Sequence, residues 1–287
     1  MSFPGKLIDT SAGRVFVHSS GKEGAPPLVL IHGMYVSHYY FKPVLTQLAE
    51  RFSVTAIDLI GFGESDRPAP EKFAYDAAAQ ADIVDEVMGA LGIASAAVVG
   101  HSMGGGVAVA LAARHPARVS RLLVENGWVY PIVMPFSGRL ALLPGLGGFI
   151  FKKLFSRGDL ARHFRDVFKD PALATPEMID YYWERFNRAG ARAAGHAALK
   201  AFAATPDNTA DPGRVKCPTL ILWGEEDKLF PMAHAKRLGK QIAGAKVEVV
   251  PAAKHSPHEE RPEEFLRAAI PFLEGRDVQA AAPAAVA

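Results

Sequence analysis

Short apolar runs alternate with longer amphipathic stretches along most of the chain. The runs are rich in β-branched residues and nearly free of polar ones, and they lie at residues 28–31, 54–57, 96–99, 122–124, 219–223 and 247–250. This composition is typical of strands that are buried on both faces of a parallel sheet. Between the runs, the pattern predicts helices at residues 40–51, 75–91, 103–114, 231–242 and 262–273. Alternation of this kind predicts βαβ units.

The first part of the chain has a different pattern, in which glycine and proline interrupt short apolar segments. Residues 6–10 and 14–20 flank a turn at Ala12-Gly13, and a third segment covers residues 26–32. These segments predict short strands that enter the sheet in an antiparallel arrangement.

One interval is too long for a single crossover helix. Residues 128–210 separate two predicted strands, and most connections are far shorter. The interval is Ala-rich and contains many aromatic residues, among them Trp128, Tyr130, Phe149, Phe151, Phe155, Tyr181, Tyr182 and Trp183. We therefore predict an α/β fold with a mostly parallel, doubly wound sheet, flanking helices and an inserted helical cap. Residues 1–127 and 211–275 form the predicted core, residues 128–210 the cap, and residues 276–287 a flexible tail.

Composition limits the partners and the location that we expect. The chain has 32 basic and 30 acidic residues, and no run of like charges favours a nucleic-acid partner. Cys217 is the only cysteine, which excludes an intramolecular disulfide and a cysteine-based metal site and favours a reducing compartment. The sequence shows no secretory signal and no apolar run of roughly 18 residues, the length of a membrane-spanning helix. We expect a soluble, cytoplasmic protein without integral membrane association.

The most informative local pattern is Gly100-His101-Ser102-Met103-Gly104-Gly105. It follows a predicted strand directly and precedes a predicted helix. A G-x-S-x-G turn in this context strains the serine and exposes its hydroxyl at the edge of the sheet, while the glycines avoid steric clashes. The pattern alone is weak because glycine is common. The strand and helix around it make Ser102 the candidate nucleophile.

A serine hydroxyl needs a base that takes its proton and a third group that orients the base. In folds with this turn, the order along the chain is Ser, acid, His. Carboxylates at residues 225–227 follow one predicted strand, and His255 follows the next. Both sites lie beyond the carboxyl ends of strands, where open α/β sheets bind ligands.

These patterns together resemble those of the α/β-hydrolase superfamily over nearly the whole chain. The blocks that match, in the family's order, are His32-Gly33, DLIGFGESDRP at residues 58–68, GHSMGG at 100–105, WGEEDKLFP at 223–231 and KHSPHEERPEEF at 254–265. The resemblance implies Asp227 as the acid and His255 as the general base. It also implies an oxyanion hole made of the backbone N–H groups of Met34 and Met103. It implies neither a cofactor nor a metal.

Two nearby residues offer alternatives for these roles. His258 is a second candidate base, but Pro257 and the family's spacing favour His255 and leave His258 as a surface or second-layer residue. Glu125 ends a predicted strand and is a second candidate acid, because some relatives carry the acid there. His258-Glu259-Glu260 lacks the H-E-x-x-H spacing of a helical zinc site and is interpreted as the start of the last helix.

Other polar residues near the motifs have structural interpretations. We expect Glu225 and Glu226 to be solvated in their loop, His101 to pack beside the serine turn, and His32 to brace its own loop. The glycine-rich segment at residues 144–148 lacks the Lys-Ser/Thr of a phosphate loop and is interpreted as a bend in the cap.

Hydrolysis of a carboxylic ester through a Ser102 acyl-enzyme is the leading hypothesis, with a small-molecule ester as the partner. The apolar stretch at residues 129–155 either binds an apolar acyl or aryl group or packs the cap onto the sheet. Tyr35, Tyr39, Trp128 and Trp183 are the candidates for the substrate pocket.

The sequence also bears on four other functions. Ser102 disfavours haloalkane dehalogenases and epoxide hydrolases, whose nucleophile is aspartate. Carbon–carbon bond hydrolases of diketone-like ring-cleavage products share the order Ser, Asp, His, but their oxyanion loop usually has more glycine and an asparagine, which residues 34–41 (MYVSHYYF) lack. A cofactor-free haloperoxidase-like reaction is a side activity that the same triad could support. A non-catalytic binding protein is disfavoured by the complete triad.

Overall fold

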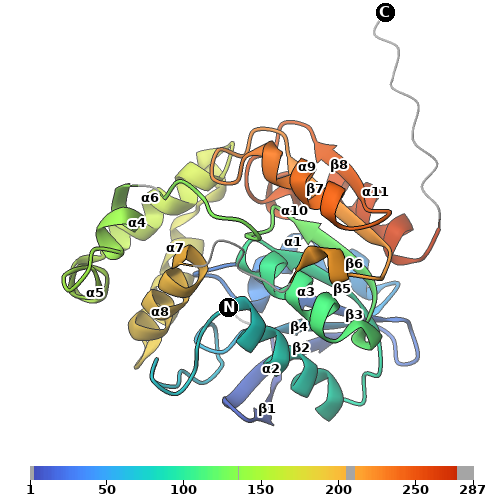
Figure 1. Cartoon of the computed structure of the whole chain (residues 1–287), viewed down its shortest axis with the longest axis horizontal. Helices are drawn as coiled ribbons and strands as arrows, with labels where there is room; N and C mark the ends of the chain where they lie inside the picture. The colour runs from blue at the N-terminus through green and yellow to red at the C-terminus, as the bar shows by residue number, and fades with distance from the viewer. Residues whose placement is uncertain (1–2, 135, 205–210, 277–287) are drawn as a thin grey trace, which may run out of the picture.

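The computed structural model describes residues 3–134, 136–204 and 211–276. In this part of the chain, eight strands form one sheet in the order β1-β2-β4-β3-β5-β6-β7-β8 (Figure 1). The strands are β1 (Lys6–Thr10), β2 (Gly13–Ser20), β3 (Pro27–Ile31), β4 (Ser53–Ile57), β5 (Ala96–His101), β6 (Val119–Glu125), β7 (Thr219–Gly224) and β8 (Lys246–Val250). β2 pairs antiparallel with β1 and with β4, whereas the other neighbours pair in parallel.

Helices cover both faces of the sheet. One layer consists of α1 (Lys42–Ala49) and α11 (Pro262–Leu273), and the other of α2 (Ala77–Ala90), α3 (Met103–Arg114) and α9 (Met232–Gln241). Side chains alternate across a strand, so an all-apolar strand needs a helical layer on each face. In β3, Leu28 and Leu30 pack with the first layer, while Val29 and Ile31 pack with the second. The predicted fold class is confirmed.

Strand β8 departs from the prediction that the apolar runs are buried on both faces. Val247 and Val249 are exposed, and only Val250 in this strand is buried. β8 is the last strand of the sheet and pairs with β7 alone. The prediction is wrong for this run because β8 has a neighbouring strand on one side only, which leaves the side chains along its other side open to solvent.

The interval between β6 and β7 is helical and lies to one side of the sheet, at the left of Figure 1. Its elements are α4 (Phe136–Ala141), α5 (Gly147–Phe149), the π-helical turn η3 (Ile150–Leu154), α6 (Arg157–Val167), α7 (Pro176–Phe186) and α8 (Ala191–Ala204). The Ser156 side chain accepts from the N–H of Asp159 to cap α6, and the Thr175 side chain caps α7 in the same way. The predicted tail lies outside the described residues except for Arg276.

Shorter turns complete the described part of the chain. They are η1 (His38–Phe41), η2 (Pro116–Arg118), η4 (Pro171–Leu173), η5 (Pro212–Arg214) and the single turn α10 (Pro257–Glu260). No helix in the described ranges is both long enough and apolar enough to cross a membrane.

Candidate active site

Ser102 occupies the tight turn between β5 and α3. Its backbone has a φ of 55° and a ψ of −121°, a strained conformation that residues with a side chain rarely adopt. The turn packs so closely that glycine is required beside it. A Cβ atom on Gly104 would lie 2.3 Å from the carbonyl oxygen of Ile31, and one on Gly33 would lie 3.0 Å from Cβ of Ser102. This geometry is the strand-to-helix turn that presents a nucleophilic hydroxyl.

The structure brings Ser102, His255 and Asp227 into one hydrogen-bonded chain. Nε2 of His255 lies 3.0 Å from Oγ of Ser102, and Nδ1 of His255 lies 2.9 Å from Oδ2 of Asp227. An ionised carboxylate only accepts hydrogen bonds, so Nδ1 donates to Asp227 and Nε2 of the neutral ring can accept the serine proton. All three residues are buried. The arrangement can activate a serine for nucleophilic attack.

Four hydrogen bonds hold the Asp227 carboxylate. Oδ1 accepts from the backbone N–H groups of Leu229, at 2.8 Å, and Phe230, at 3.0 Å, while Oδ2 accepts from the Asn126 amide at 2.5 Å as well as from His255. Burial by itself would raise the pKa of Asp227, but the interactions with His255, Phe230 and Asn126 outweigh it and lower the pKa. Asp227 is therefore held as the anion that the histidine requires.

Asn126 is a residue of the site that the motifs do not reveal. It follows β6 directly and has a φ of 42°, in the left-handed region that asparagine tolerates. Its Nδ2 donates to Asp227, and its Oδ1 accepts the N–H of Gly224 at 3.1 Å. Asn126 thereby joins the acid to the end of β7. The available signal was its position after a predicted strand, next to the candidate acid Glu125.

The two amides predicted for the oxyanion hole lie near the nucleophile. Met103 is the first residue of α3, and Met34 lines the same cavity as Ser102. Neither N–H group donates to another protein atom within the described ranges. His32 braces the Met34 loop as expected: its Nδ1 lies 2.6 Å from the carbonyl oxygen of Gly33, and its Nε2 accepts the N–H of Leu59.

The loop that carries His255 is held from the core and from the helical interval. The backbone N–H of His255 donates to the carbonyl oxygen of Val167, at the end of α6. Nε2 of His101 donates to the carbonyl oxygen of His255 at 3.0 Å. Burial, together with the nearby His258 and His255, lowers the pKa of His101 well below its usual value, so this ring is a neutral support. His101 packs beside the turn, as expected.

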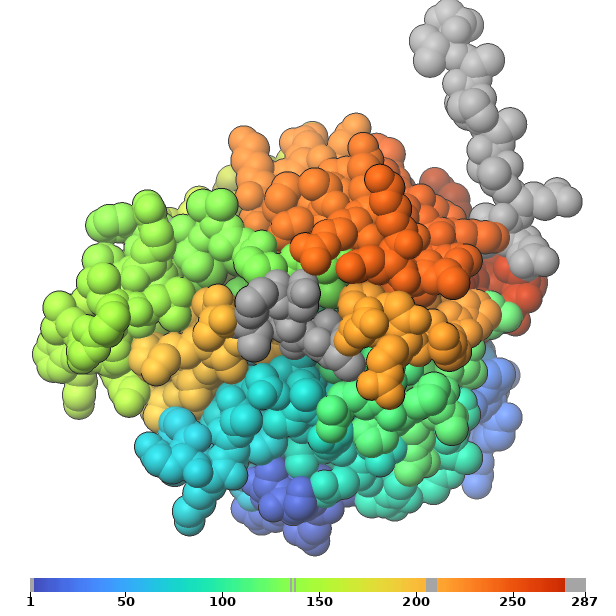
Figure 2. All heavy atoms as spheres, viewed as in Figure 1, coloured from blue at the N-terminus to red at the C-terminus, as the bar shows by residue number. Residues whose placement is uncertain are grey.

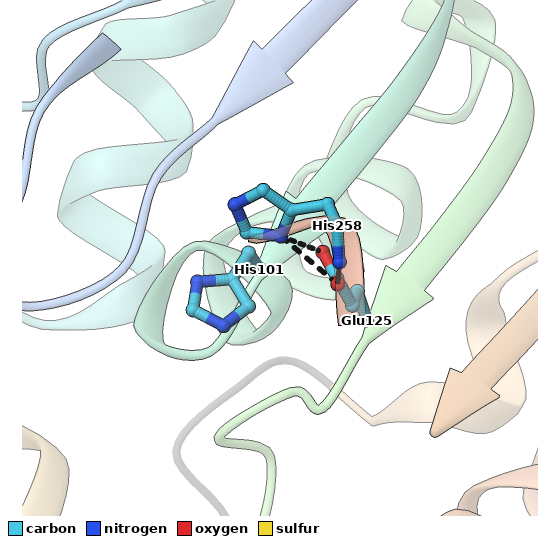
Figure 3. Close-up of side chains that lie close together, drawn as sticks. All are labelled: His101, Glu125 and His258. Atoms are coloured by element: carbon cyan, nitrogen blue, oxygen red, sulfur yellow. Dashed lines mark hydrogen bonds and ion pairs between the residues drawn. The ribbon is translucent and has the colours of Figure 1, made fainter. Parts of the chain in front are cut away.

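A second buried histidine–carboxylate pair joins His258 of α10 to Glu125 of β6 (Figure 3). Nδ1 of His258 lies 2.8 Å from Oε2 of Glu125, and its Nε2 lies 3.1 Å from the carbonyl oxygen of Tyr40. Both ring nitrogens face acceptors, so His258 is an imidazolium. Burial opposes this charge, but the Glu125 carboxylate outweighs it and raises the pKa of His258.

This pair bears on the two alternatives that the sequence left open, His258 as the base and Glu125 as the acid. His258 is fully buried, so a surface position for it is wrong. Glu125 contacts His258, whereas Asp227 contacts His255, so Glu125 is not placed to act as the acid for His255.

His101, Glu125 and His258 also form the one cluster in the described ranges with the spacing of a metal site, since their ligand atoms lie within 4.8 Å of one another. The nitrogens of His258 and the oxygens of Glu125 already have hydrogen-bond partners, and only Nδ1 of His101 has none. A metal bound to either nitrogen of His258 would have to displace one proton of the imidazolium together with the hydrogen bond that this proton makes. The donor set suits a buried ion pair better than a metal ion.

A cavity of about 300 Å³ opens onto Ser102 and His255. Its wall is mostly apolar and draws on the oxyanion loop, the helical interval and the loop after β7, with Met34, Tyr35, Val36, Trp128, Ile132, Met134, Phe151, Phe155, Phe164, Leu199, Leu229 and Phe230 among its residues. Burial raises the pKa of the Tyr35 phenol, which therefore stays protonated. The cavity can enclose an apolar group next to the nucleophile.

Of the four residues predicted for the pocket, Tyr35 and Trp128 line this cavity, and Tyr39 and Trp183 do not. The Tyr39 ring packs against Tyr181, with ring centroids 4.8 Å apart. Trp183 packs against Phe186 and the guanidinium of Arg192. Sequence composition identified aromatic residues near the site but not the direction in which each points.

His163 is the second residue that the motifs do not reveal. It belongs to α6 and lines the cavity, and its ring nitrogens have no hydrogen-bond partner among the described residues. Burial, with a smaller effect from His255, lowers the pKa of His163 to about 4. A neutral imidazole thus faces the cavity. Charged residues also contribute to the lining, namely Asp159, Arg162, Asp166 and Lys228.

The strand order, the strained serine turn and the hydrogen-bonded Ser, His and Asp define a class of enzyme. The family model described as alpha/beta hydrolase fold matches residues 26–262. The chain belongs to this family of hydrolases.

Individual relatives differ in the bond that their names describe. The chain is 29% identical to the putative carbamate hydrolase RutD of Caulobacter sp. (strain K31), over 90% of this chain and 94% of that protein. It is 30% identical to the 2-hydroxymuconate semialdehyde hydrolase of Pseudomonas putida, with 95% of both chains covered. Among solved structures it is similar to a bacterial membrane phospholipase A, with a TM-score of 0.78 and 26% identity over 95% of this chain and 86% of that chain.

Proposed function

We propose that this protein is a serine hydrolase that cleaves carboxylic esters with an apolar acyl or aryl group. The observation that carries the proposal is the hydrogen-bonded chain from Asp227 through His255 to Ser102, which opens into an apolar cavity. Residues 128–210 serve as its cap, over a core of residues 1–127 and 211–275.

Acylation uses the geometry directly. Oγ of Ser102 attacks the ester carbonyl carbon while Nε2 of His255 takes the hydroxyl proton, and Asp227 stabilises the imidazolium that forms. The N–H groups of Met34 and Met103 donate to the oxyanion, and losing one such donor typically costs about 10²- to 10³-fold in rate. The C–O bond to the alcohol then breaks, and His255 returns the proton to the departing alcohol.

Deacylation repeats these roles with water as the nucleophile. His255 takes a proton from the water as its oxygen attacks the acyl carbon of the Ser102 ester. Collapse of the second tetrahedral intermediate breaks the bond to Oγ, which recovers its proton from His255. The products are a carboxylic acid and free enzyme.

The substrate class follows from the cavity wall. Apolar side chains from the cap, among them Trp128, Ile132 and Phe151, surround the space next to Ser102. An acyl or aryl group gains about 25 cal/mol for each Å² of apolar surface that it buries there. The similarity to a phospholipase A supports an ester, and the similarity to a putative carbamate hydrolase supports attack on a related carbonyl group.

The test is hydrolysis of p-nitrophenyl esters of increasing acyl length by the native chain and by Ser102→Ala. We expect turnover with an optimum beyond acetate, and a loss of at least about 10⁴-fold in kcat in the variant. A fluorophosphonate should label Ser102 in the native chain and leave Ser102→Ala unlabelled, as seen by mass spectrometry of the peptide. A folded native chain that hydrolyses none of the esters would overturn the proposal.

A second candidate is hydrolysis of a carbon–carbon bond in a ring-cleavage product. The observation that favours it is the 30% identity with the 2-hydroxymuconate semialdehyde hydrolase. Against it, the oxyanion loop at residues 34–41 contains no asparagine and no glycine. A kcat/KM for 2-hydroxymuconate semialdehyde that exceeds the values for all esters would select this candidate instead.

A further inference from the structure

The cap segment at residues 131–134 and 136–155 is apolar on its outer side as well as toward the cavity. Six large apolar side chains in it are between 44% and 92% exposed: Val133, Phe136, Leu143, Leu146, Phe149 and Leu154. The other exposed large apolar side chains among the described residues are Leu7, Val247 and Val249, which lie on edge strands of the sheet. Isolated exposed apolar residues are common, but a concentration of this kind in one short segment marks an interaction surface.

The charge of the same segment has one sign. No aspartate or glutamate occurs from residue 126 to residue 158. Arg139, Lys152 and Lys153 are exposed and form no ion pair within the described ranges, while Arg157 pairs with Asp180. Exposed apolar side chains next to unpaired cations match the chemistry of an anionic lipid surface, in which the cations meet headgroups and the apolar groups enter the acyl boundary.

The segment is also placed where a flat surface can reach it. α4 and α5 lie at the far left end of the molecule, away from the sheet (Figure 1), and the space-filling view shows the same part of the chain as a protruding light-green lobe (Figure 2). Its inner side chains, Ile132, Met134, Phe151 and Phe155, line the cavity above Ser102. One short segment therefore separates the molecular surface from the cavity.

We propose that residues 131–134 and 136–155 form a membrane-docking surface that binds anionic bilayers peripherally, with the six exposed apolar side chains at the acyl boundary and Arg139, Lys152 and Lys153 at the headgroups. Such docking needs no membrane-spanning helix. If the proposed esterase function also holds, an apolar ester dissolved in the bilayer reaches the cavity across this segment without passing through water.

The experiment is co-sedimentation with phosphatidylcholine vesicles that do or do not contain phosphatidylglycerol. All proteins carry Ser102→Ala, so the result does not depend on hydrolysis and is separable from a failure of the proposed function. We expect binding to the anionic vesicles that weakens with added salt, and at least about tenfold weaker binding after Lys152→Glu with Lys153→Glu. The triple variant Phe136→Ser, Phe149→Ser, Leu154→Ser should bind the anionic vesicles weakly both without and with added salt.

A matched control removes exposed apolar side chains elsewhere, through Leu7→Ser with Val249→Ser, and should bind like the parent. Thermal unfolding midpoints verify that each variant is folded. If the triple variant does not fold, the variant with Lys152→Glu and Lys153→Glu provides the test. The proposal is overturned if the parent does not bind anionic vesicles, or if the control loses as much binding as the cap variants. It is also overturned if the parent is a dimer that ignores vesicles and the triple variant is a monomer, since a second copy would then cover the surface.

Discussion

Two histidines only three positions apart have different partners and therefore different chemistry. His255 points one nitrogen at Asp227 and the other at Ser102, so it can exchange a proton with the nucleophile. His258 has acceptors at both nitrogens and is held as a cation without access to the cavity. At the scale of single residues, the hydrogen-bond partner of the second nitrogen decides whether a histidine can act as a base.

The first prediction separates the two acids by activity. In Asp227→Asn the amide cannot hold His255 in the tautomer that accepts the serine proton, and we expect kcat for a p-nitrophenyl ester to fall by about 10³- to 10⁴-fold. Glu125→Gln is the matched control, because it changes a buried carboxylate that contacts the other histidine. It should keep kcat per folded molecule within about tenfold. Equal losses in the two variants would contradict the assignment of the acid.

The second prediction concerns Asn126, whose amide donates to Asp227. Hydrogen bonds to charged groups are worth about 1.5–3 kcal/mol, so Asn126→Ala should lower kcat by about ten- to a hundredfold with little change in KM. Asn126→Gly also removes the amide but accepts a φ of 42° without strain. The two variants should therefore be equally slow, with the alanine variant the less stable of the two. Near-native kcat in the glycine variant would show that only the backbone conformation matters.

At the scale of elements, the pair of Glu125 and His258 joins the end of β6 to α10. Glu125 accepts from both the backbone N–H and the ring of His258, and its own carbonyl oxygen accepts the N–H of Ser102. The elements that carry the nucleophile and the base are thus connected through one buried ion pair. Its contribution should be to stability, because neither charge faces the cavity.

The third prediction is that Glu125→Gln lowers the free energy of unfolding by about 3–5 kcal/mol, since it leaves a buried imidazolium without its counter-charge. The pKa of His258 is raised by folding. Its stabilising effect is therefore fully present below the unfolded pKa of about 6.5 and is lost as pH rises through the folded pKa. Urea titrations at several pH values across this range should show that the free energies of unfolding of the native protein and of Glu125→Gln differ most at the lowest pH. If the difference between the two free energies of unfolding grew with increasing pH, the stabilising ion pair between Glu125 and His258 would be refuted.

The helices and strands themselves were largely predictable from the sequence, because the residues that they bury are apolar and recur with a regular spacing. The predicted helices at 103–114 and 262–273 have the observed bounds of α3 and α11, and each apolar run falls on a strand. The exposure of β8 was not predictable, because it depends on which strand ends the sheet. Strand order is set by tertiary pairing and leaves little local signal.

In the candidate site, predictability depended on whether a role requires a local motif. The turn around Ser102 needs glycines at fixed positions, and those were visible. Asn126 meets Asp227 across 101 positions, and Glu125 meets His258 across 133, and neither pair requires a local pattern. Tyr39 was assigned to the pocket because it belongs to an aromatic cluster just after the oxyanion loop, and Trp183 because it lies in the aromatic-rich interval. Neither observation carries information about the direction of a side chain.

At the scale of the whole molecule, the cap shares its apolar core with the sheet. One continuous cluster of buried side chains contains Phe151, Phe186 and Phe202 of the cap together with Ile31 and Ile221 of the sheet. The N–H of His255 also donates to the carbonyl oxygen of Val167 in the cap, so the cap helps to hold the loop that carries the base. A cap that shares its core with the sheet should not unfold alone.

The fourth prediction is that the cap and the sheet unfold in one transition, and the three tryptophans allow a direct test. Trp223→Phe leaves Trp128 and Trp183, which report on the cap, and the double replacement of these two by Phe leaves Trp223 of β7. Within each variant, fluorescence and far-UV circular dichroism should give the same urea midpoint, which is the signature of a cooperative unit. The comparison is made inside one protein, so a stability change from the replacement itself does not matter. A fluorescence midpoint for the cap that precedes the circular dichroism midpoint would instead mean that the shared cluster is too weak to couple the cap to the sheet, and that the cap opens while the sheet remains folded.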